Sequence, residues 1–539
     1  MSKKTFMKGA VILGAAGIIV KILGAFFRIP LGNLIAADGM AYYQTVYPIY
    51  NLMLTVATAG IPVAISRMVS ERISQGNYIG ANRVFKTALY VMIILGIILF
   101  SLSFFLANYI IGFIEGMGDA IYALKAIAPA LFFVPVMASF RGYFQGMQNM
   151  KPTAISQIFE QFFRVATGLA LAIVLVSKGK AFAAAGATFG ATAGSFAGLI
   201  IVFLIYLLLK STRFHKNKMA ESKLEFGEHP ESTGKIINQV FLIAVPITFG
   251  AAIMPIMQYI DSFLVINRLT ESGWQIAEAR SLYGQLTGYA ASLVNMPQVI
   301  TQAIAISLVP TISAAFSRGD NEFMHHNVKL GVRTAMMIGL PCAVGFFVLA
   351  EPIMLLLYPA QKEDAVSAAN ALIVLSIGVI FLAMVQTLTS ILQGVGKQNI
   401  PAINLLIGAV IKLLLTYFLT GIPFLNVKGA AIGTVTAFFV ATVLNLLAVK
   451  KYTGTIIEKG LTYIKPTLSA LIMGIVAYGT YFLMSLVAGN SISTLVSIGL
   501  AGISYIILLF ATGSIKEEEL VEFPKGDKLT KVYSKILRR

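Results

Sequence analysis

The sequence is poor in the residues from which disulfides and metal sites are built. Its 539 residues include one cysteine and four histidines. A disulfide framework is therefore excluded, and a Cys/His metal site is not expected. Charged residues make up only 12% of the chain, about half the share found in soluble globular domains, whereas hydrophobic residues make up 57%. This composition excludes an ordinary soluble domain.

The loops also lack the motifs of common enzyme classes. They contain no Walker loop, no Gly-x-Gly-x-x-Gly sequence and no Gly-x-Ser-x-Gly sequence. No polar segment is long enough to form a separate catalytic domain. We therefore expect neither enzymatic activity nor a bound cofactor.

Apolar runs of about 20 residues recur along the whole chain, and each is long enough to cross a hydrocarbon layer of about 30 Å. They predict an all-α polytopic membrane protein with fourteen transmembrane helices. The expected spans are 8–33, 41–66, 86–112, 120–144, 153–177, 182–209, 237–267, 281–310, 328–350, 366–392, 401–422, 428–449, 465–487 and 492–513.

The distribution of basic residues predicts which side of the membrane each loop occupies. With an even number of spans, the termini share one side with every second loop, and most of the 41 lysines and arginines lie there. Few lie in the opposite loops: Lys125, Lys178, Lys180, Arg268, Arg280, Lys362 and Lys428. Cytoplasmic loops are the basic ones, so both termini are expected in the cytoplasm. The net charge of +18 is then a topology signal and not evidence for nucleic-acid binding.

The chain contains an internal duplication. The stretch "FQGMQNMKPTAIS" (Phe144–Ser156) aligns without gaps with "LQGVGKQNIPAIN" (Leu392–Asn404). In the same order, "GATFG" (Gly186–Gly190) aligns with "GAAIG" (Gly429–Gly433). Because each half has six spans, the two repeats are parallel, a symmetry that in transporters places a substrate cavity between two lobes.

These observations predict a domain organisation of two lobes with additions. The expected parts are an N-lobe at 1–210, a cytoplasmic connector at 211–235, a C-lobe at 236–451, two extra spans at 452–515 and a basic cytoplasmic tail at 516–539. The fold class is thus two parallel six-helix repeats plus two C-terminal helices.

Six ionisable residues fall well inside the expected spans: Lys21, Arg28, Glu160, Arg164, Asp261 and Lys412. A charge at the centre of a bilayer costs about 2.5–3.5 kcal/mol on insertion scales, so each should face water or a partner. Four of the six are basic, which predicts a positively charged cavity. Such a cavity suits an anionic ligand, and guanidinium groups match phosphate groups in particular.

Each of these charges also has a second interpretation. Arg28 could extend toward the outer headgroups from the later part of its helix. Glu160 and Arg164, spaced i and i+4, are expected to form an ion pair of either structural or functional role. Asp261 is either the partner of a cavity cation or a site for a coupling Na⁺ or proton. The duplication places Lys412 opposite Arg164.

Three tyrosines near the start of the second expected span share one helix face: Tyr43, Tyr47 and Tyr50. An aromatic belt at the membrane interface is the favoured interpretation, and stacking on a sugar is the alternative.

The motifs "KILGAFFRIPLG" (Lys21–Gly32), "ISLVPTIS" (Ile306–Ser313) and the paired "QG…P" loops resemble those of the multidrug/oligosaccharidyl-lipid/polysaccharide (MOP) exporter superfamily. Within it, the chain is most similar to the branch of stage V sporulation protein B and the lipid II flippases, over its whole length.

That resemblance implies a flippase working by alternating access. Its expected substrate is an undecaprenyl-pyrophosphate-linked saccharide, with lipid II, the peptidoglycan precursor, as the first candidate. Another polyprenyl-linked saccharide and a cation-coupled multidrug exporter are the alternatives. The chain would work as a monomer in a bacterial cell membrane, among membrane lipids, with a vegetative or a sporulation role.

By position, the resemblance makes Arg28 the cavity arginine of the first span, with Lys21 as the basic residue before it. Asp261 corresponds to the acidic residue of span seven that joins a sodium site in some members, and Lys412 lies where some members supply sodium ligands. Arg280, which enters span eight, is a further candidate for pyrophosphate binding. In this sequence Ile29 follows Arg28, where family members often carry an acidic residue.

Overall fold

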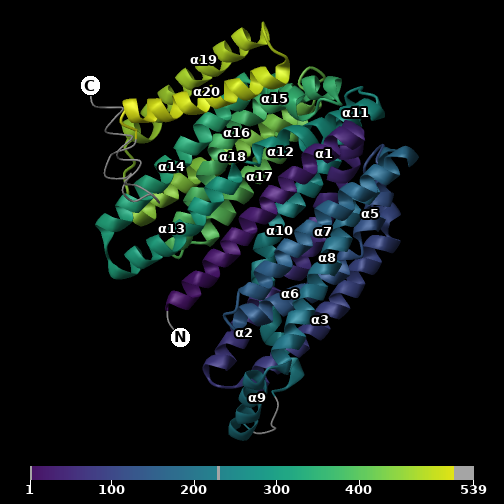
Figure 1. Ribbon diagram of the computed structural model, residues 1–539, viewed down its shortest axis with the longest axis vertical. Helices are drawn as coiled ribbons and strands as arrows, with labels where there is room; N and C mark the ends of the chain where they lie inside the picture. Colours follow the sequence, from purple (N-terminus) through teal and green to yellow (C-terminus); the bar gives the residue numbers. More distant parts are fainter. Residues whose placement is uncertain (1–2, 227–230, 515–539) are drawn as a thin grey trace. The chain divides into compact units, whose positions relative to one another are not determined.

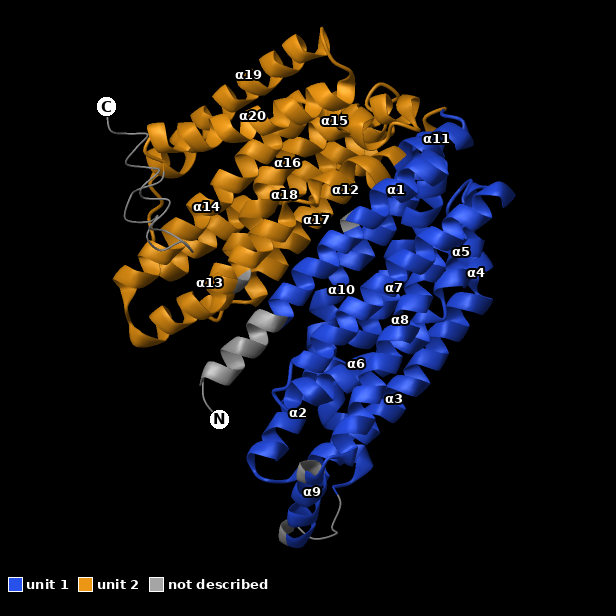
Figure 2. Ribbon diagram, viewed as in Figure 1, with its two compact units in different colours: residues 1–270, 274–284 blue, residues 271–273, 285–539 orange. Residues whose placement is uncertain are grey.

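The computed structural model of the protein describes residues 3–226 and 231–514 (Figure 1). Over these residues the regular structure is entirely helical, without a strand. They form two compact units: unit 1 holds residues 1–270 and 274–284, and unit 2 holds residues 271–273 and 285–539 (Figure 2). The all-α fold expected from the sequence is confirmed. The predicted tail at 516–539 lies outside the described residues.

Unit 1 consists of helices α1 to α11, which are labelled in Figure 2. Their bounds are α1 Lys3–Thr58, α2 Ile61–Ser74, α3 Tyr78–Phe105, α4 Ala107–Gly112, α5 Ala120–Ile127, α6 Ala130–Gly146, α7 Lys151–Leu175, η1 Val176–Lys178, α8 Lys180–Ser211, α9 Arg213–Phe226, α10 Thr233–Glu271 and α11 Ile276–Gly284.

Unit 2 begins with a π-helical turn and ends with the pair α19 and α20. Its elements are η2 Gln285–Ala290, α12 Ala291–Val294, α13 Gln298–Arg318, α14 Asn321–Val348, α15 Ala350–Leu357, α16 Lys362–Gly394, α17 Asn399–Thr420, α18 Val427–Thr453, η3 Gly460–Ile464, α19 Lys465–Ser485 and α20 Asn490–Ala511.

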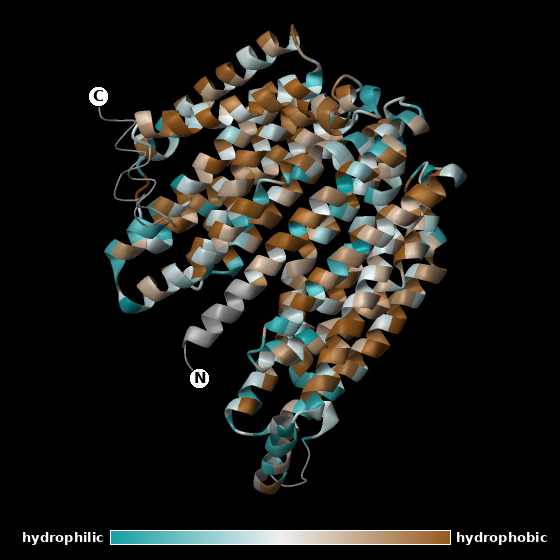
Figure 3. Ribbon diagram, viewed as in Figure 1, coloured by the Kyte–Doolittle hydropathy of each residue, from teal (hydrophilic) through white to brown (hydrophobic). Residues whose placement is uncertain are grey.

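The described residues contain 13 helical segments that are long and apolar enough to cross a membrane. The first of them, Leu13–Ser74, runs through both of the first two expected spans. In Figure 3 most helical residues of each unit are hydrophobic, and hydrophilic residues gather at helix ends and in α9. Many large apolar side chains are exposed, such as Ile94 and Ile475, as lipid-facing side chains must be. The count of fourteen spans stays a prediction.

A sharp bend at Ala36 separates the two expected spans inside α1. Ala36 has φ 58° and ψ −177°, a backbone conformation that is essentially restricted to glycine. Such a conformation costs a non-glycine residue about 1–3 kcal/mol and persists only where the surroundings hold it. Ala36 and its neighbours Ile35 and Ala37 are buried, so packing fixes the bend.

Helix α10 packs into unit 1 through three side chains spaced four residues apart: Ile236, Val240 and Ala244. They join a buried cluster that includes Ile61 and Ile65 of α2. For this reason the compact units divide the chain near Gly284, whereas the predicted lobes meet at the 211–235 connector. The predicted lobe boundaries concern the sequence repeat and stay predictions.

The repeated glycine motif holds neighbouring helices in close contact within each unit. In unit 1, a Cβ atom at Gly190 would lie 2.4 Å from the backbone oxygen of Arg164, and one at Gly194 would lie 2.4 Å from that of Glu160. These distances leave no room for any side chain, so α8 lies directly on the backbone of α7. Small residues at four-residue spacing allow this approach in membrane helices.

Unit 2 repeats the arrangement at the aligned position. A Cβ atom at Gly433 of α18 would lie 3.1 Å from the backbone oxygen of Lys412 of α17. Gly190 aligns with Gly433, and Arg164 aligns with Lys412, so the same glycine covers the same basic position in each repeat. The duplication seen in the sequence is therefore also present in the packing.

We expect Gly194→Leu to separate α7 from α8 and to lower the free energy of unfolding by about 3 kcal/mol, the upper part of the usual range for overpacking. Thermal unfolding of the purified protein in lipid nanodiscs measures this effect. Gly17→Leu is the matched control, because nothing lies within 4 Å of a Cβ atom at Gly17. Equal stability of the two variants would contradict the prediction.

Candidate functional site

A buried cluster of three charged side chains lies between α6 and α7 of unit 1. Arg141 Nη2 donates to Glu160 Oε2 at 2.9 Å, and Arg164 Nη2 donates to Glu160 Oε1 at 3.0 Å. Arg141 also donates through Nε to the hydroxyl of Ser156 at 2.9 Å. The three charged side chains are only 13–20% exposed. One carboxylate therefore serves two guanidinium groups, and the cluster keeps a positive charge.

The tyrosines of α1 surround the Arg164 guanidinium. Tyr43 and Tyr50 are each 2% exposed, and Tyr47 lies between them, with its ring centroid 4.6 Å from that of Tyr43. All three rings lie within electrostatic range of Arg164. The expectation of an interfacial belt is wrong for Tyr43 and Tyr50, because both are packed inside unit 1.

Arg28 lies on α1 and is positioned by its neighbour. Phe27 is buried and packs against both Gly168 of α7 and the ring of Tyr43, with ring centroids 6.0 Å apart. The half-buried Arg28 guanidinium lies within electrostatic range of Tyr43, as does Arg164. Both basic groups therefore lie near Tyr43. Lys21, two turns earlier, is exposed on α1.

Arg280 is placed apart from this cluster, at the end of unit 1 where α5 and α11 lie, opposite α9 (Figure 2). Its Nε lies 3.5 Å from Asp38 Oδ1, and its Nη1 donates to the backbone oxygen of Gly116 at 3.3 Å. The guanidinium also lies over the ring of Tyr42, 5.1 Å from its centroid. Lys180 contacts the other oxygen of Asp38 at 3.2 Å. The role predicted for Arg280 in pyrophosphate binding stays a prediction.

The two remaining sequence candidates lie in different units. Asp261 is half-buried on α10 in unit 1, and Lys412 is half-buried on α17 in unit 2. Their predicted roles in ion coupling and in anion binding stay predictions.

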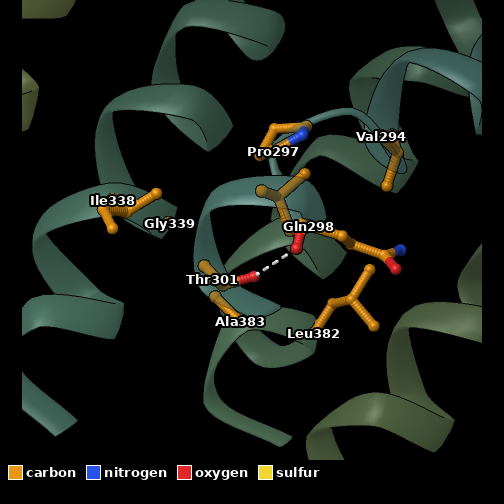
Figure 4. A pocket seen from close by; sticks show the side chains of 9 residues that line it. Val294, Pro297, Gln298, Thr301, Ile338, Gly339, Leu382 and Ala383 are labelled. Carbon is orange, nitrogen blue, oxygen red and sulfur yellow. Dashed lines mark hydrogen bonds between the residues drawn. The ribbon is translucent and has the colours of Figure 1, made fainter. Parts of the chain in front are cut away.

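Unit 2 has a polar network where an expected span is interrupted. The break between α12 and α13 ends at Pro297, and Gln298 and Thr301 follow on the first turn of α13. Thr301 donates to the side-chain oxygen of Gln386 at 2.5 Å, and Gln386 donates to Gln298 at 3.1 Å. Figure 4 shows this crevice, with the Thr301 hydroxyl also directed at the backbone oxygen of Gln298. The polar groups of the crevice hydrogen-bond to one another, so the crevice is a packed contact between α13 and α16.

Sequence reasoning missed two charged residues, Arg141 and Asp38. Arg141 falls near the end of an expected span, where it looks like an ordinary flanking charge. Asp38 falls in the short loop between the first two expected spans, and its partner Arg280 is 242 residues away in the sequence. A single basic residue three positions before the end of a span was the only available signal for Arg141.

The buried cluster between α6 and α7 has two guanidinium groups and one carboxylate, so its basic groups exceed its acidic ones. Arg28 and Asp261 are half-buried elsewhere in unit 1. Guanidinium groups donate in pairs to phosphate oxygens. Within residues 3–226 and 231–514, no group of three or more His, Cys, Asp or Glu side chains is placed to hold a metal ion.

Comparison with known families and proteins adds independent information. The family model "Polysaccharide biosynthesis protein" matches residues 6–316, more than half of the chain, and the MatE model matches residues 286–418. Stage V sporulation protein B of Bacillus subtilis (strain 168) is 28% identical, with 97% of this chain and 98% of that protein covered. Lipid II flippase MurJ of the same organism is also 28% identical, with 84% of each chain covered.

Solved structures show the same fold. A lipid II flippase MurJ in an inward closed conformation superposes with a TM-score of 0.70 at 16% identity, covering 95% of this chain and all of that one. An inward-facing multidrug resistance MATE family transporter superposes with a TM-score of 0.69 at 14% identity, covering 84% and 98%. These relatives are transport proteins and not enzymes. The chain is a multi-pass membrane protein that belongs to the polysaccharide biosynthesis protein family and has the fold of a transporter of the MOP superfamily.

Proposed function

We propose that the protein is a flippase that moves an undecaprenyl-pyrophosphate-linked saccharide from the inner to the outer leaflet of a bacterial cell membrane. The observation that carries this proposal is the buried cluster between α6 and α7, in which two arginines share one carboxylate, in a member of a polysaccharide biosynthesis family. Lipid II is the first candidate substrate. The name of the relative "Lipid II flippase MurJ" supports it, at 28% identity.

In this proposal Arg28 binds the pyrophosphate, because its guanidinium can donate two parallel hydrogen bonds to phosphate oxygens. Arg164, which like Arg28 lies near Tyr43, adds a second positive charge. Glu160 holds Arg164 in place and is itself held by Arg141. Lys21, Lys412 and Arg280 are further candidates for contacts with the charged headgroup.

Transport proceeds by alternating access of two lobes around the bound headgroup. With both termini in the cytoplasm, the headgroup enters from the basic side of the protein. An inside-negative membrane potential favours outward movement of an anionic headgroup by about 2.3 kcal/mol per charge per 100 mV. Coupling to Na⁺ or H⁺ at Asp261 would provide a second driving force. The protein acts as a monomer in this scheme.

The proposal is tested with purified protein in sealed vesicles that contain labelled lipid II. We expect the protein to expose inner-leaflet lipid II to an external modifying enzyme, at a rate above that of protein-free vesicles. A second undecaprenyl-linked glycan, assayed in parallel, tests the choice of lipid II. Transport of neither glycan would refute the proposal.

A cation-coupled multidrug exporter is the second candidate, because the MatE model matches residues 286–418. Such an exporter needs carboxylates to bind organic cations, whereas the buried cluster between α6 and α7 has two arginines with one glutamate. Efflux of ethidium from the same vesicles, without movement of either glycan, would favour this candidate.

A further inference from the structure

A hollow of about 350 Å³ lies beside α11 in unit 1. Three separate stretches of unit 1 form it: Asp38 and Tyr42 of α1, the segment before and within α5, and residues 178–182 between η1 and the start of α8. Arg280 of α11 completes the wall. Its volume falls in the range of about 300–1,000 Å³ that is typical of small-molecule sites.

Charged contacts join several of the residues that line the hollow. Asp38 contacts both Lys180 and Arg280, at 3.2 and 3.5 Å. Tyr42 lies under the Arg280 guanidinium and donates through its hydroxyl to Asp119 Oδ2 at 3.4 Å. These contacts join four segments of unit 1, so the hollow is formed by the fold itself.

The lining of the hollow includes two aromatic rings. Tyr122 is 46% exposed and Phe182 is 40% exposed, and their ring centroids lie 4.8 Å apart at an interplanar angle of 32°. Lys178 is exposed and also lines the hollow. Gly179, with φ +124°, makes the turn between Lys178 and Phe182. The hollow therefore combines apolar ring faces with charged hydrogen-bonding groups.

We infer that this hollow binds a pyranose saccharide of one or two rings. A pyranose has an apolar face of C–H groups, which packs on aromatic rings, and a rim of hydroxyls, which bond to carboxylates and lysines. A simple ion would not need the rings, and a purely apolar ligand would leave the charged groups without water. This inference rests on the proposed function. In a flippase, the hollow would hold the saccharide part of the lipid-linked headgroup on the outer side of the membrane.

The binding test uses the full-length protein in phospholipid nanodiscs with N,N′-diacetylchitobiose as the probe. Maltoside detergents are avoided because their headgroup is itself a disaccharide. Saturation-transfer NMR should detect binding of the probe at millimolar concentration. We expect Tyr122→Ala and Phe182→Ala each to weaken binding at least tenfold, and Phe182→Tyr to retain it.

Tyr109→Ala is the matched control, because Tyr109 is a 75% exposed tyrosine of the nearby α4 that does not line the hollow. Its binding should equal that of the unaltered protein. Absence of probe binding to the unaltered protein, or equal binding to all variants, would overturn the inference. If the ring variants lower only the thermal stability in nanodiscs, the two rings are membrane anchors and the inference is also wrong.

The vesicle assay separates this inference from the proposed function. Lipid-linked glycan transport without chitobiose binding would leave the proposed function standing and refute the hollow as a saccharide site. Chitobiose binding that depends on Tyr122 and Phe182, without transport of either glycan, would support the hollow and refute the flippase.

Discussion

Arg28→Ala is expected to reduce the rate of lipid-linked glycan transport about 100-fold. Removing one partner of a buried, hydrogen-bonded charge pair costs about 2–5 kcal/mol, and each 1.4 kcal/mol corresponds to a factor of ten. In the proposed mechanism Arg28 supplies the paired hydrogen bonds to the pyrophosphate. The vesicle assay described above measures the rate directly.

Two further variants separate binding from folding. Arg28→Lys keeps the charge but loses the planar pair of donors, so we expect an intermediate rate. Arg213→Ala removes an exposed arginine of α9 and should leave the rate unchanged. Thermal unfolding in nanodiscs checks that every variant is folded. A folded Arg28→Ala protein that transports at the normal rate would remove Arg28 from the mechanism.

Glu160→Ala is expected to lower the free energy of unfolding by about 3–5 kcal/mol. The reason is that Arg141 and Arg164 share this carboxylate in a buried site, and breaking a buried ion pair from one side leaves uncompensated charge. Unfolding titrations with sodium dodecyl sulfate measure the change.

The chain provides a matched control in Glu221, which contacts Lys218 at 2.8 Å on the exposed face of α9. Glu221→Ala should leave stability unchanged, because exposed ion pairs contribute little. The triple variant Arg141→Met, Glu160→Leu, Arg164→Met should regain stability, since apolar side chains often replace buried ion pairs without loss. It should nevertheless transport poorly, because it lacks Arg164. Equal stability of Glu160→Ala and Glu221→Ala would contradict the prediction.

Most of the membrane helices could be predicted from the sequence, because an apolar run of about 20 residues has few other stable structures in a bilayer. The bend at Ala36 could not, since alanine is not a residue that favours a positive φ, and Gly39 nearby would have been the natural choice. The bend depends on packing of surrounding side chains, which no local pattern contains.

The part of the candidate site that is formed by residues close together in the sequence was predictable. The i and i+4 spacing of Glu160 and Arg164 indicates their contact, and the structure has it at 3.0 Å. Arg141 approaches Glu160 from another helix, and Asp38 reaches Arg280 across 242 residues. Such contacts depend on how helices pack, and one sequence without relatives does not contain that information.

The direct contact between α7 and α8 also bears on the order in which the protein assembles. The two helices are joined by a four-residue turn at 176–179, so their glycine-lined contact needs no other part of the chain. Contacts between sequence neighbours form quickly, because little chain entropy is lost in closing the loop. The α7–α8 hairpin can therefore dock as soon as it leaves the insertion machinery, and its counterpart α17–α18 can do the same later during synthesis. Each half of the protein thus contains its own early folding nucleus, and the two nuclei are synthesised one after the other.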